Sequence, residues 1–283
     1  MLVTGDTIAF VGLSDPRHER EWIQLETLKN FFASYGVNVF ISPLLYEMEC
    51  SRPAWAKELM RLFEHPDVKA IFDVSGGNLA NGILPYLDFE RIRQAEKPFF
   101  GYSDLTSVLN AIYTMTGKPS YLFQLRTLCW SQAKQQQARL VASLFEQRHD
   151  LFDVQWEWLS RERMQGVVVG GNVRCFLKLA GTPYFPDLTE RLLFLESYGG
   201  KENLIRSYFY QLAGMGAFQK VSGLMLGTFT ELEKEGGRIE DIVHEVVPAD
   251  LPVVKTRQIG HGEDSRALVI GETLQLERGD SHA

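Results

Sequence analysis

The sequence has few cysteines and no long apolar segment. Its 283 residues include only three cysteines, Cys50, Cys129 and Cys175, which lie far apart and form no C-x-x-C pair. This usage is typical of a reducing compartment rather than of a disulfide-rich secreted protein. No apolar run approaches the ~18–20 residues that a membrane-spanning helix needs, and residues 1–6 lack the pattern of a signal peptide. We therefore expect a cytoplasmic protein with no membrane partner.

Positive charge is also scarce. The chain carries 29 lysines and arginines against 36 aspartates and glutamates, a formal net charge of -7, and no stretch concentrates basic residues. Nucleic acid is not an expected partner, because binding to phosphates depends on a basic surface. The hydrophobic content of 45% and charged content of 23% are ordinary for a globular protein. A chain of this length predicts two domains.

The first half alternates short apolar strands with amphipathic helices. Strands are predicted at 7–11, 37–41, 68–74 and 99–100, and helices from Pro16 to about Gly36 and at 53–63, 79–87, 88–96, 105–115 and 132–147. This alternation is typical of a parallel sheet covered on both faces, so we expect a doubly wound, flavodoxin-like α/β domain over residues 1–150. Ligands of such sheets bind beyond the carboxyl ends of the strands.

The second half predicts a smaller mixed α/β domain over residues 165–283. A half-exposed strand is predicted at 152–158, and the charged run Arg161-Glu162-Arg163 is the expected boundary. Beyond it, strands are predicted at 167–169, 192–195, 221–226, 252–254, 268–270 and 273–276, with helices at 203–213 and 239–247.

Ser103 lies on a predicted strand-to-helix turn. Gly101 lets the chain turn sharply after the strand, and helical spacing begins at Leu105. A hydroxyl there is near a helix N-terminus, whose free N–H groups and dipole favour a developing negative charge. This is the logic of a nucleophile elbow, although Leu105 stands where that motif has its second glycine. The alternative is that Ser103 or Asp104 merely caps the helix.

A second loop at the same sheet edge, Ser75-Gly76-Gly77-Asn78, follows the third strand. Paired glycines let the backbone approach a ligand and present N–H groups to an anion. In order, this loop, the run Leu84-Pro85-Tyr86-Leu87-Asp88 and the turn Gly101-Tyr102-Ser103-Asp104 resemble the LD-carboxypeptidase family of serine peptidases. That family includes murein tetrapeptide carboxypeptidases and microcin C immunity proteases, and the similarity covers nearly the whole chain. Residues 120–125 depart from the His-Gly-Pro turn that many murein-type members carry there.

A serine nucleophile needs a base that a third group orients. Of the six histidines, His261 lies between two glycines in a loop after a strand, while Glu196 ends a buried strand. By themselves, these features also fit a solvated histidine and a glutamate paired with Lys201 or an arginine. The other histidines are His18, His65, His149, His244 and His282, and the zinc-protease pattern begun at His244-Glu245 fails because Pro248 replaces its second histidine. No metal and no cofactor are expected.

The resemblance implies a role for each candidate residue. Ser103 is the nucleophile, His261 the base and Glu196 the acid, and the backbone N–H groups of Gly77 and Asp104 form the oxyanion hole. Substrate binding is assigned to Gly76, Asn78, Asn172 and Lys201. The order serine, acid, histidine is also that of α/β-hydrolases, whose upstream His-Gly-Gly loop this chain lacks.

The expected reaction is hydrolysis of an amide bond near a peptide C-terminus through an acyl-enzyme. Two substrates fit the resemblance, a murein tetrapeptide and the peptide–nucleotide junction of a microcin-like antibiotic. A homodimer is compatible with both. The alternative of another class is a small-molecule binding module that keeps the anion sites without catalysis.

Overall fold

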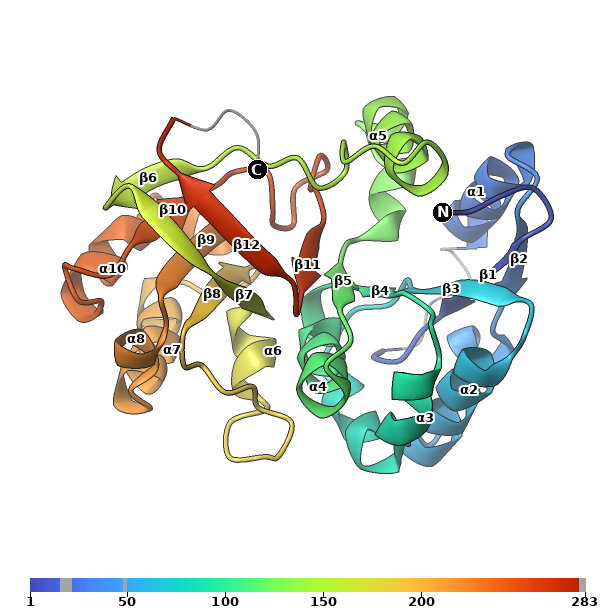
Figure 1. Ribbon diagram of the computed structural model, residues 1–283, viewed down its shortest axis with the longest axis horizontal. Coiled ribbons are helices and arrows are strands. Elements are labelled where there is room, and N and C mark those ends of the chain that lie inside the picture. Colours follow the sequence, from blue (N-terminus) through green and yellow to red (C-terminus); the bar gives the residue numbers. More distant parts are fainter. Residues whose placement is uncertain (16–21, 48–49, 280–283) are drawn as a thin grey trace.

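Two six-stranded sheets divide the described part of the chain into two α/β domains that lie side by side (Figure 1). The computed structural model describes residues 1–15, 22–47 and 50–279. Pro16, as the predicted start of the first helix, and His18 and His282 lie outside these residues.

The first sheet has the order β11-β5-β4-β3-β1-β2. Its parallel strands follow the flavodoxin-like order 2-1-3-4-5, which confirms the expected doubly wound domain; they are β1 (Thr7–Val11), β2 (Asn38–Ile41), β3 (Val68–Asp73), β4 (Phe99–Gly101) and β5 (Ser120–Leu122). The helices are α1 (Trp22–Ser34), α2 (Arg52–Glu64), α3 (Phe89–Gln94), α4 (Thr106–Thr116) and α5 (Ala133–Phe145). Short 3₁₀ turns complete the domain: η2 (Pro43–Tyr46), η3 (Ala80–Tyr86), η4 (Ser103–Leu105) and η5 (Leu125–Cys129).

Both faces of this sheet are covered, as the apolar strands predict. In β1, Ile8 and Phe10 join the apolar cluster under α1 and α5, whereas Ala9 and Val11 join the cluster under α2, α3 and α4. All four side chains are buried. Figure 1 shows α1 and α5 on one side of the strands and α2, α3 and α4 on the other. Because alternate side chains of a strand point to opposite faces of the sheet, β1 contributes to two separate cores.

The second sheet has the order β12-β7-β8-β9-β10-β6. Strands β7 (Arg163–Asn172), β8 (Arg191–Ser197), β9 (Gly223–Phe229) and β10 (Val253–Lys255) are parallel, and the antiparallel strands β12 (Thr273–Glu277) and β6 (Glu157–Ser160) form its edges. The helices are α6 (Val173–Leu177), α7 (Glu202–Gly214), α8 (Ala217–Lys220), α9 (Thr230–Lys234) and α10 (Ile239–Val246). The expected mixed α/β character of the C-terminal half is confirmed.

Three strands differ from the sequence prediction, and one of them, β5 (Ser120–Leu122), was not predicted at all. The segment expected as a strand at 152–158 forms β6 only from Glu157 onward, because Phe152 instead packs against the core of the first domain. The strand predicted at 268–270, β11 (Leu268–Ile270), pairs with β5 and so extends the first sheet rather than the second. The ranges 1–150 and 165–283 for the two domains stay a prediction. None of the described helices is both long and apolar enough to cross a bilayer.

Candidate active site

The turn that carries Ser103 has a strained backbone. Ser103 follows β4 at the start of η4 with φ of 54°, a left-handed conformation that residues other than glycine rarely adopt. Such strain clusters at functional sites. A Cβ at Gly101 would lie 2.7 Å from the Cβ of Leu105, so the tight turn requires glycine there.

Neither Ser103 nor Asp104 is the residue that caps the helix at this turn. The residues that precede η4 and α4 are Tyr102 and Leu105, and neither makes a side-chain capping hydrogen bond. The fully buried carboxylate of Asp104 instead accepts hydrogen bonds from the Ser14 hydroxyl at 2.6 Å, from the Ala80 N–H at 2.8 Å and from the Lys178 ammonium. Asp104 thus ties the nucleophile turn to the loops after β1 and β3.

These donors stabilise the ionised form of the Asp104 carboxyl. Burial alone raises the pKa of the Asp104 carboxyl, but the hydrogen bonds from Lys178, Ser14 and the Ala80 N–H outweigh it and hold that pKa below its usual range. Lys178 belongs to the second domain, so this ion pair crosses between the domains. The carboxylate therefore stays ionised beside Ser103 at neutral pH.

The loop with the paired glycines faces Asp15. Gly77 has φ of 144°, and a Cβ there would lie 2.1 Å from the carboxylate of Asp15. The position therefore accepts only glycine. The Asn78 N–H donates to Asp15 Oδ1 at 3.4 Å, and the Asn78 side-chain oxygen accepts from Arg174.

His261 and Glu196 meet at the carboxyl end of the second sheet. The Nδ1 atom of His261 lies 2.8 Å from Oε2 of Glu196, whose side chain is fully buried at the end of β8. The other oxygen, Oε1, accepts from Asn172 Nδ2 at 3.1 Å. Glu196 therefore pairs with the histidine, and not with Lys201 as the alternative reading of the sequence had it.

The loop that carries His261 is held firmly against β9. The Ile259 carbonyl accepts from the Thr228 N–H at 3.0 Å, and the Gly260 N–H donates to Ser265 Oγ at 3.2 Å. A Cβ at Gly260 would lie 1.7 Å from Thr228 Oγ1, so this glycine permits the close approach.

Tyr102 joins the two halves of the site. Its buried ring packs edge-on against the His261 ring, with centroids 4.8 Å apart, and Tyr102 directly precedes Ser103. Burial and the negative charge of Glu196 raise the pKa of the Tyr102 hydroxyl well above its usual value. His261 of the second domain therefore contacts the turn that carries Ser103 in the first.

A polar contact between α4 and β7 supports this approach. The Asn110 side chain exchanges two hydrogen bonds with the backbone of Gly170, at 2.8 and 2.9 Å. The Asn172 N–H donates to Thr106 Oγ1 at 2.9 Å, where a Cβ on Gly171 would collide with Thr106. Since α4 begins three residues after Ser103, these bonds set the position of Ser103 relative to Glu196.

The binding roles of the other predicted residues stay predictions. Lys201 precedes α7 with its side chain 67% exposed, and its ammonium lies 3.3 Å from Glu235. The sequence reasoning missed three residues that hold the site together, namely Ser14, Arg174 and Lys178. No local motif could have revealed them. Lys178 lies 74 and 100 residues from Asp104 and Asn78, Arg174 lies 97 residues from Gly77, and Ser14 lies 90 residues from Asp104.

The cysteines are poor nucleophiles. Burial raises the pKa of Cys175 to about 12 and that of Cys129 to about 11, and it also raises the pKa of Cys50. Within the described ranges, no group of three or more histidine, cysteine or acidic side chains is arranged to hold a metal ion.

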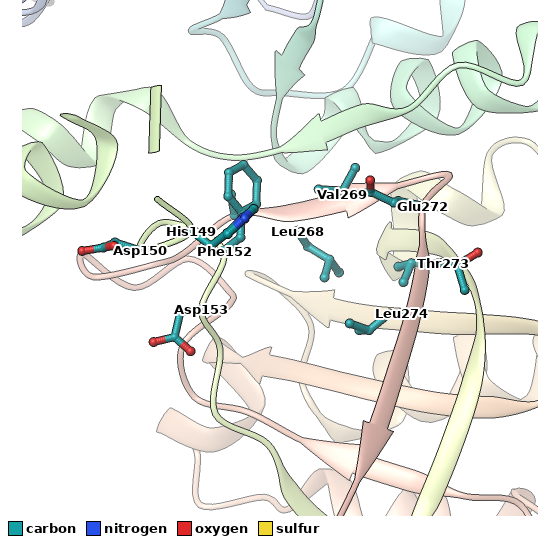
Figure 2. A pocket seen from close by; sticks show the side chains of 11 residues that line it. His149, Asp150, Phe152, Asp153, Leu268, Val269, Glu272, Thr273 and Leu274 are labelled. Atoms are coloured by element: carbon teal, nitrogen blue, oxygen red, sulfur yellow. The ribbon is translucent and has the colours of Figure 1, made fainter. Parts of the chain in front are cut away.

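A cavity of about 530 Å³ lies apart from these residues. Figure 2 shows it between the segment around Phe152 and the consecutive strands β11 and β12, with the acidic side chains Asp150, Asp153 and Glu272 on its wall. Neither Ser103 nor His261 lines it.

Comparison with known proteins agrees with the geometry. Residues 8–122 match the LD-carboxypeptidase N-terminal domain, and residues 165–276 match the LD-carboxypeptidase C-terminal domain. The murein tetrapeptide carboxypeptidase of Pseudomonas aeruginosa is 27% identical over 78% of this chain and 76% of its own. The microcin C7 self-immunity protein MccF of Escherichia coli is 23% identical over 98% of this chain and 92% of its own.

Solved structures show the same fold. MccF in complex with glutamyl sulfamoyl guanosine superposes with a TM-score of 0.87 at 20% identity, covering 98% of this chain and 94% of that one. The muramoyltetrapeptide carboxypeptidase from Oxalobacter formigenes superposes with a TM-score of 0.81 at 20% identity, covering 97% and 96%. With both of its domains matched, the chain belongs to the LD-carboxypeptidase family of serine-type peptidases.

Proposed function

We propose that this hydrolase cleaves an amide bond near a peptide C-terminus with Ser103, His261 and Glu196 as its catalytic triad. The observation that carries the proposal is the 2.8 Å contact between His261 Nδ1 and Glu196 Oε2, in a histidine whose ring packs against Tyr102. A serine beside a histidine that a buried carboxylate orients is the general arrangement of serine hydrolases.

Each residue then has one task. Glu196 accepts the Nδ1–H of His261, so that Nε2 is left unprotonated to take the proton of the Ser103 hydroxyl. The Ser103 oxygen attacks the carbonyl carbon, and the backbone N–H groups of Gly77 and Asp104 stabilise the oxyanion. His261 returns the proton to the leaving amine, and water then releases the acyl group by the same steps.

The proposed substrate is a murein tetrapeptide, cleaved at the bond to its terminal D-amino acid. The family match and the 27% identity to a murein tetrapeptide carboxypeptidase support it. A peptide–nucleotide antibiotic of the microcin C type is the second candidate, which the similarity to MccF over 98% of the chain favours. Gly76, Asn78, Asn172 and Lys201 are the proposed substrate contacts in either case.

We also propose a cellular compartment and an oligomeric state for the enzyme. Three free cysteines, one of them buried, fit a reducing cytoplasm. A homodimer is proposed from the resemblance to the family.

The test offers both substrates side by side. Purified protein and its Ser103→Ala variant are incubated with a murein tetrapeptide and with a microcin C analogue, and products are identified by mass spectrometry. Release of the terminal D-amino acid by the wild type alone supports the first candidate, and cleavage at the nucleotide junction supports the second. A serine-reactive phosphonate that fails to label Ser103, together with tight binding and no turnover, would make the chain a binding module.

A further inference from the structure

Helix α6 of the second domain reaches across to the loop that holds Gly77. Arg174 of α6 and Lys178, the residue that directly follows α6, both point to this loop: Arg174 Nη2 donates to the Gly77 carbonyl at 3.0 Å, and Lys178 Nζ donates to the Asn78 carbonyl at 2.8 Å. Both side chains are partly buried. Neither belongs to the triad or to the proposed substrate contacts.

These bonds complete a set of three on consecutive peptide groups. The carbonyl of Gly76 accepts from the Asp15 N–H at 3.3 Å, that of Gly77 from Arg174 and that of Asn78 from Lys178. In a trans peptide the N–H points opposite to the C=O of the same group. The direction of the Gly77 N–H is therefore set by the bond at Gly76, and the next two bonds prevent the loop from rotating away.

The same helix is tied to the acid and to the nucleophile turn. Asn172 caps α6, its Oδ1 accepting from the Cys175 N–H at 3.3 Å, while its Nδ2 donates to Glu196 at 3.1 Å. At the other end, Lys178 also pairs with Asp104, the residue after Ser103. One short segment, residues 172–178, thus contacts Glu196, the nucleophile turn and the glycine loop.

We propose that Arg174 and Lys178 are positioning residues of the reaction: from the second domain, they hold the Gly77 N–H in place for the oxyanion. The inference rests on the proposed function, because it needs Gly77 to be an oxyanion donor. A donor that must meet charge appearing only in the transition state has to be fixed beforehand, and small misplacements have large effects on rate. The two cations therefore make turnover depend on the contact between the domains.

The test compares Arg174→Ala and Lys178→Ala with wild type on whichever substrate is turned over. We expect kcat to fall by about 10–100-fold and KM to change less than kcat. The lost contacts at Gly77 act on the transition state, whereas Arg174 also donates to the side chain of Asn78, a proposed substrate contact. Ethylammonium added to Lys178→Ala and guanidinium at low millimolar concentration added to Arg174→Ala should restore part of kcat. Matched controls are Lys29→Ala and Arg93→Ala, which remove exposed partners of Glu26 and Glu90 and should change neither parameter.

The outcomes separate this inference from the proposed function. If Ser103→Ala is inactive while both alanine variants keep wild-type kcat, the positioning role is rejected and the triad stands. A lower kcat that no added cation restores, accompanied by a matching loss of thermal stability, assigns the two residues to folding only and also rejects the inference. If Ser103→Ala keeps full turnover, the proposed function fails and the inference fails with it.

Discussion

The Nδ1 atom of His261 lies 2.8 Å from the Oε2 atom of Glu196, across 65 residues of sequence. Neither partner is free to move. Glu196 is buried with its second oxygen bonded to Asn172, and the His261 loop is bonded to Thr228 and Ser265. In the proposed mechanism this pair selects the tautomer with the proton on Nδ1, which leaves Nε2 open as the base.

Replacing Glu196 by glutamine tests this pair. Glutamine keeps the shape of the side chain but removes its charge and can donate to Nδ1, which favours the wrong tautomer. We expect kcat to fall by about 10²–10⁴-fold while the protein stays folded. Glu90→Gln, which alters an exposed partner of Arg93, is the control. Turnover within twofold of wild type in Glu196→Gln would show that the carboxylate is not the acid of a triad.

Removing the Ser103 hydroxyl should abolish hydrolysis without weakening the fold. Its side chain makes no capping bond to η4 or α4, so the free energy of unfolding should change by less than ~0.5 kcal/mol, whereas loss of a capping serine costs about 0.5–2 kcal/mol. Urea unfolding and product assays of Ser103→Ala check both parts. Ser207→Ala, on the exposed side of α7, serves as the control for handling a serine-to-alanine change. A variant that turns over normally but melts lower would restore the capping role.

Local patterns were sufficient for most of the first domain, although they did not predict strand β5. The apolar strands from β1 to β4 and the amphipathic helices between them read directly from the sequence, because each buries its own side chains on a predictable face. Strand β11 was predicted as a strand, but its three apolar residues do not indicate which of the two sheets it joins. Its pairing with β5 arises because the chain crosses back between the domains. The short helix α6 was missed because five residues, Val173–Leu177, carry almost no period.

Some residues of the candidate site could likewise be predicted from local sequence, and others could not. Ser103 could be identified because it lies between a predicted strand that ends in a glycine and a predicted helix. Gly77 could be identified because it belongs to a pair of glycines at the same edge of the sheet. His261 and Glu196 needed the family resemblance, since a loop histidine and a strand-end glutamate are common. For Asp104 the local sequence was misleading, because it suggested a helix cap. Only the fold shows that its carboxylate accepts hydrogen bonds from Ser14, Ala80 and Lys178.

Chelators should leave the activity unchanged. The proposed mechanism routes every proton and electron pair through serine, histidine and glutamate, and the one zinc-like run, His244-Glu245, lacks its second histidine. The measurement is the rate before and after dialysis against EDTA, with a zinc-dependent peptidase treated in parallel. Activity lost in EDTA and recovered on adding zinc would overturn the serine mechanism.

Asp104 should make the stability depend on pH. Its pKa in the folded protein is lower than the ~3.9 of an unfolded aspartate. A group with a depressed folded pKa stabilises the fold above its unfolded pKa, and this contribution is lost as the pH falls through the folded value. Replacing Asp104 by asparagine should therefore lower the free energy of unfolding at pH 7 by about 1–3 kcal/mol, as expected for hydrogen bonds to a buried charge.

The decisive observation is how this difference changes with pH. Urea unfolding of wild type and Asp104→Asn, followed by tryptophan fluorescence, is measured at pH 7 and again near pH 3. Below about pH 3.9 the carboxyl takes up a proton more readily in the unfolded chain than in the fold, so the stabilisation by the ionised carboxylate, and with it the gap between the two proteins, should narrow as the pH falls. Asp250→Asn changes an exposed aspartate and should show a small difference at both values. A gap for Asp104→Asn that stays constant from pH 7 to pH 3 would mean that the ion pair with Lys178 adds nothing to the stability of the domain contact.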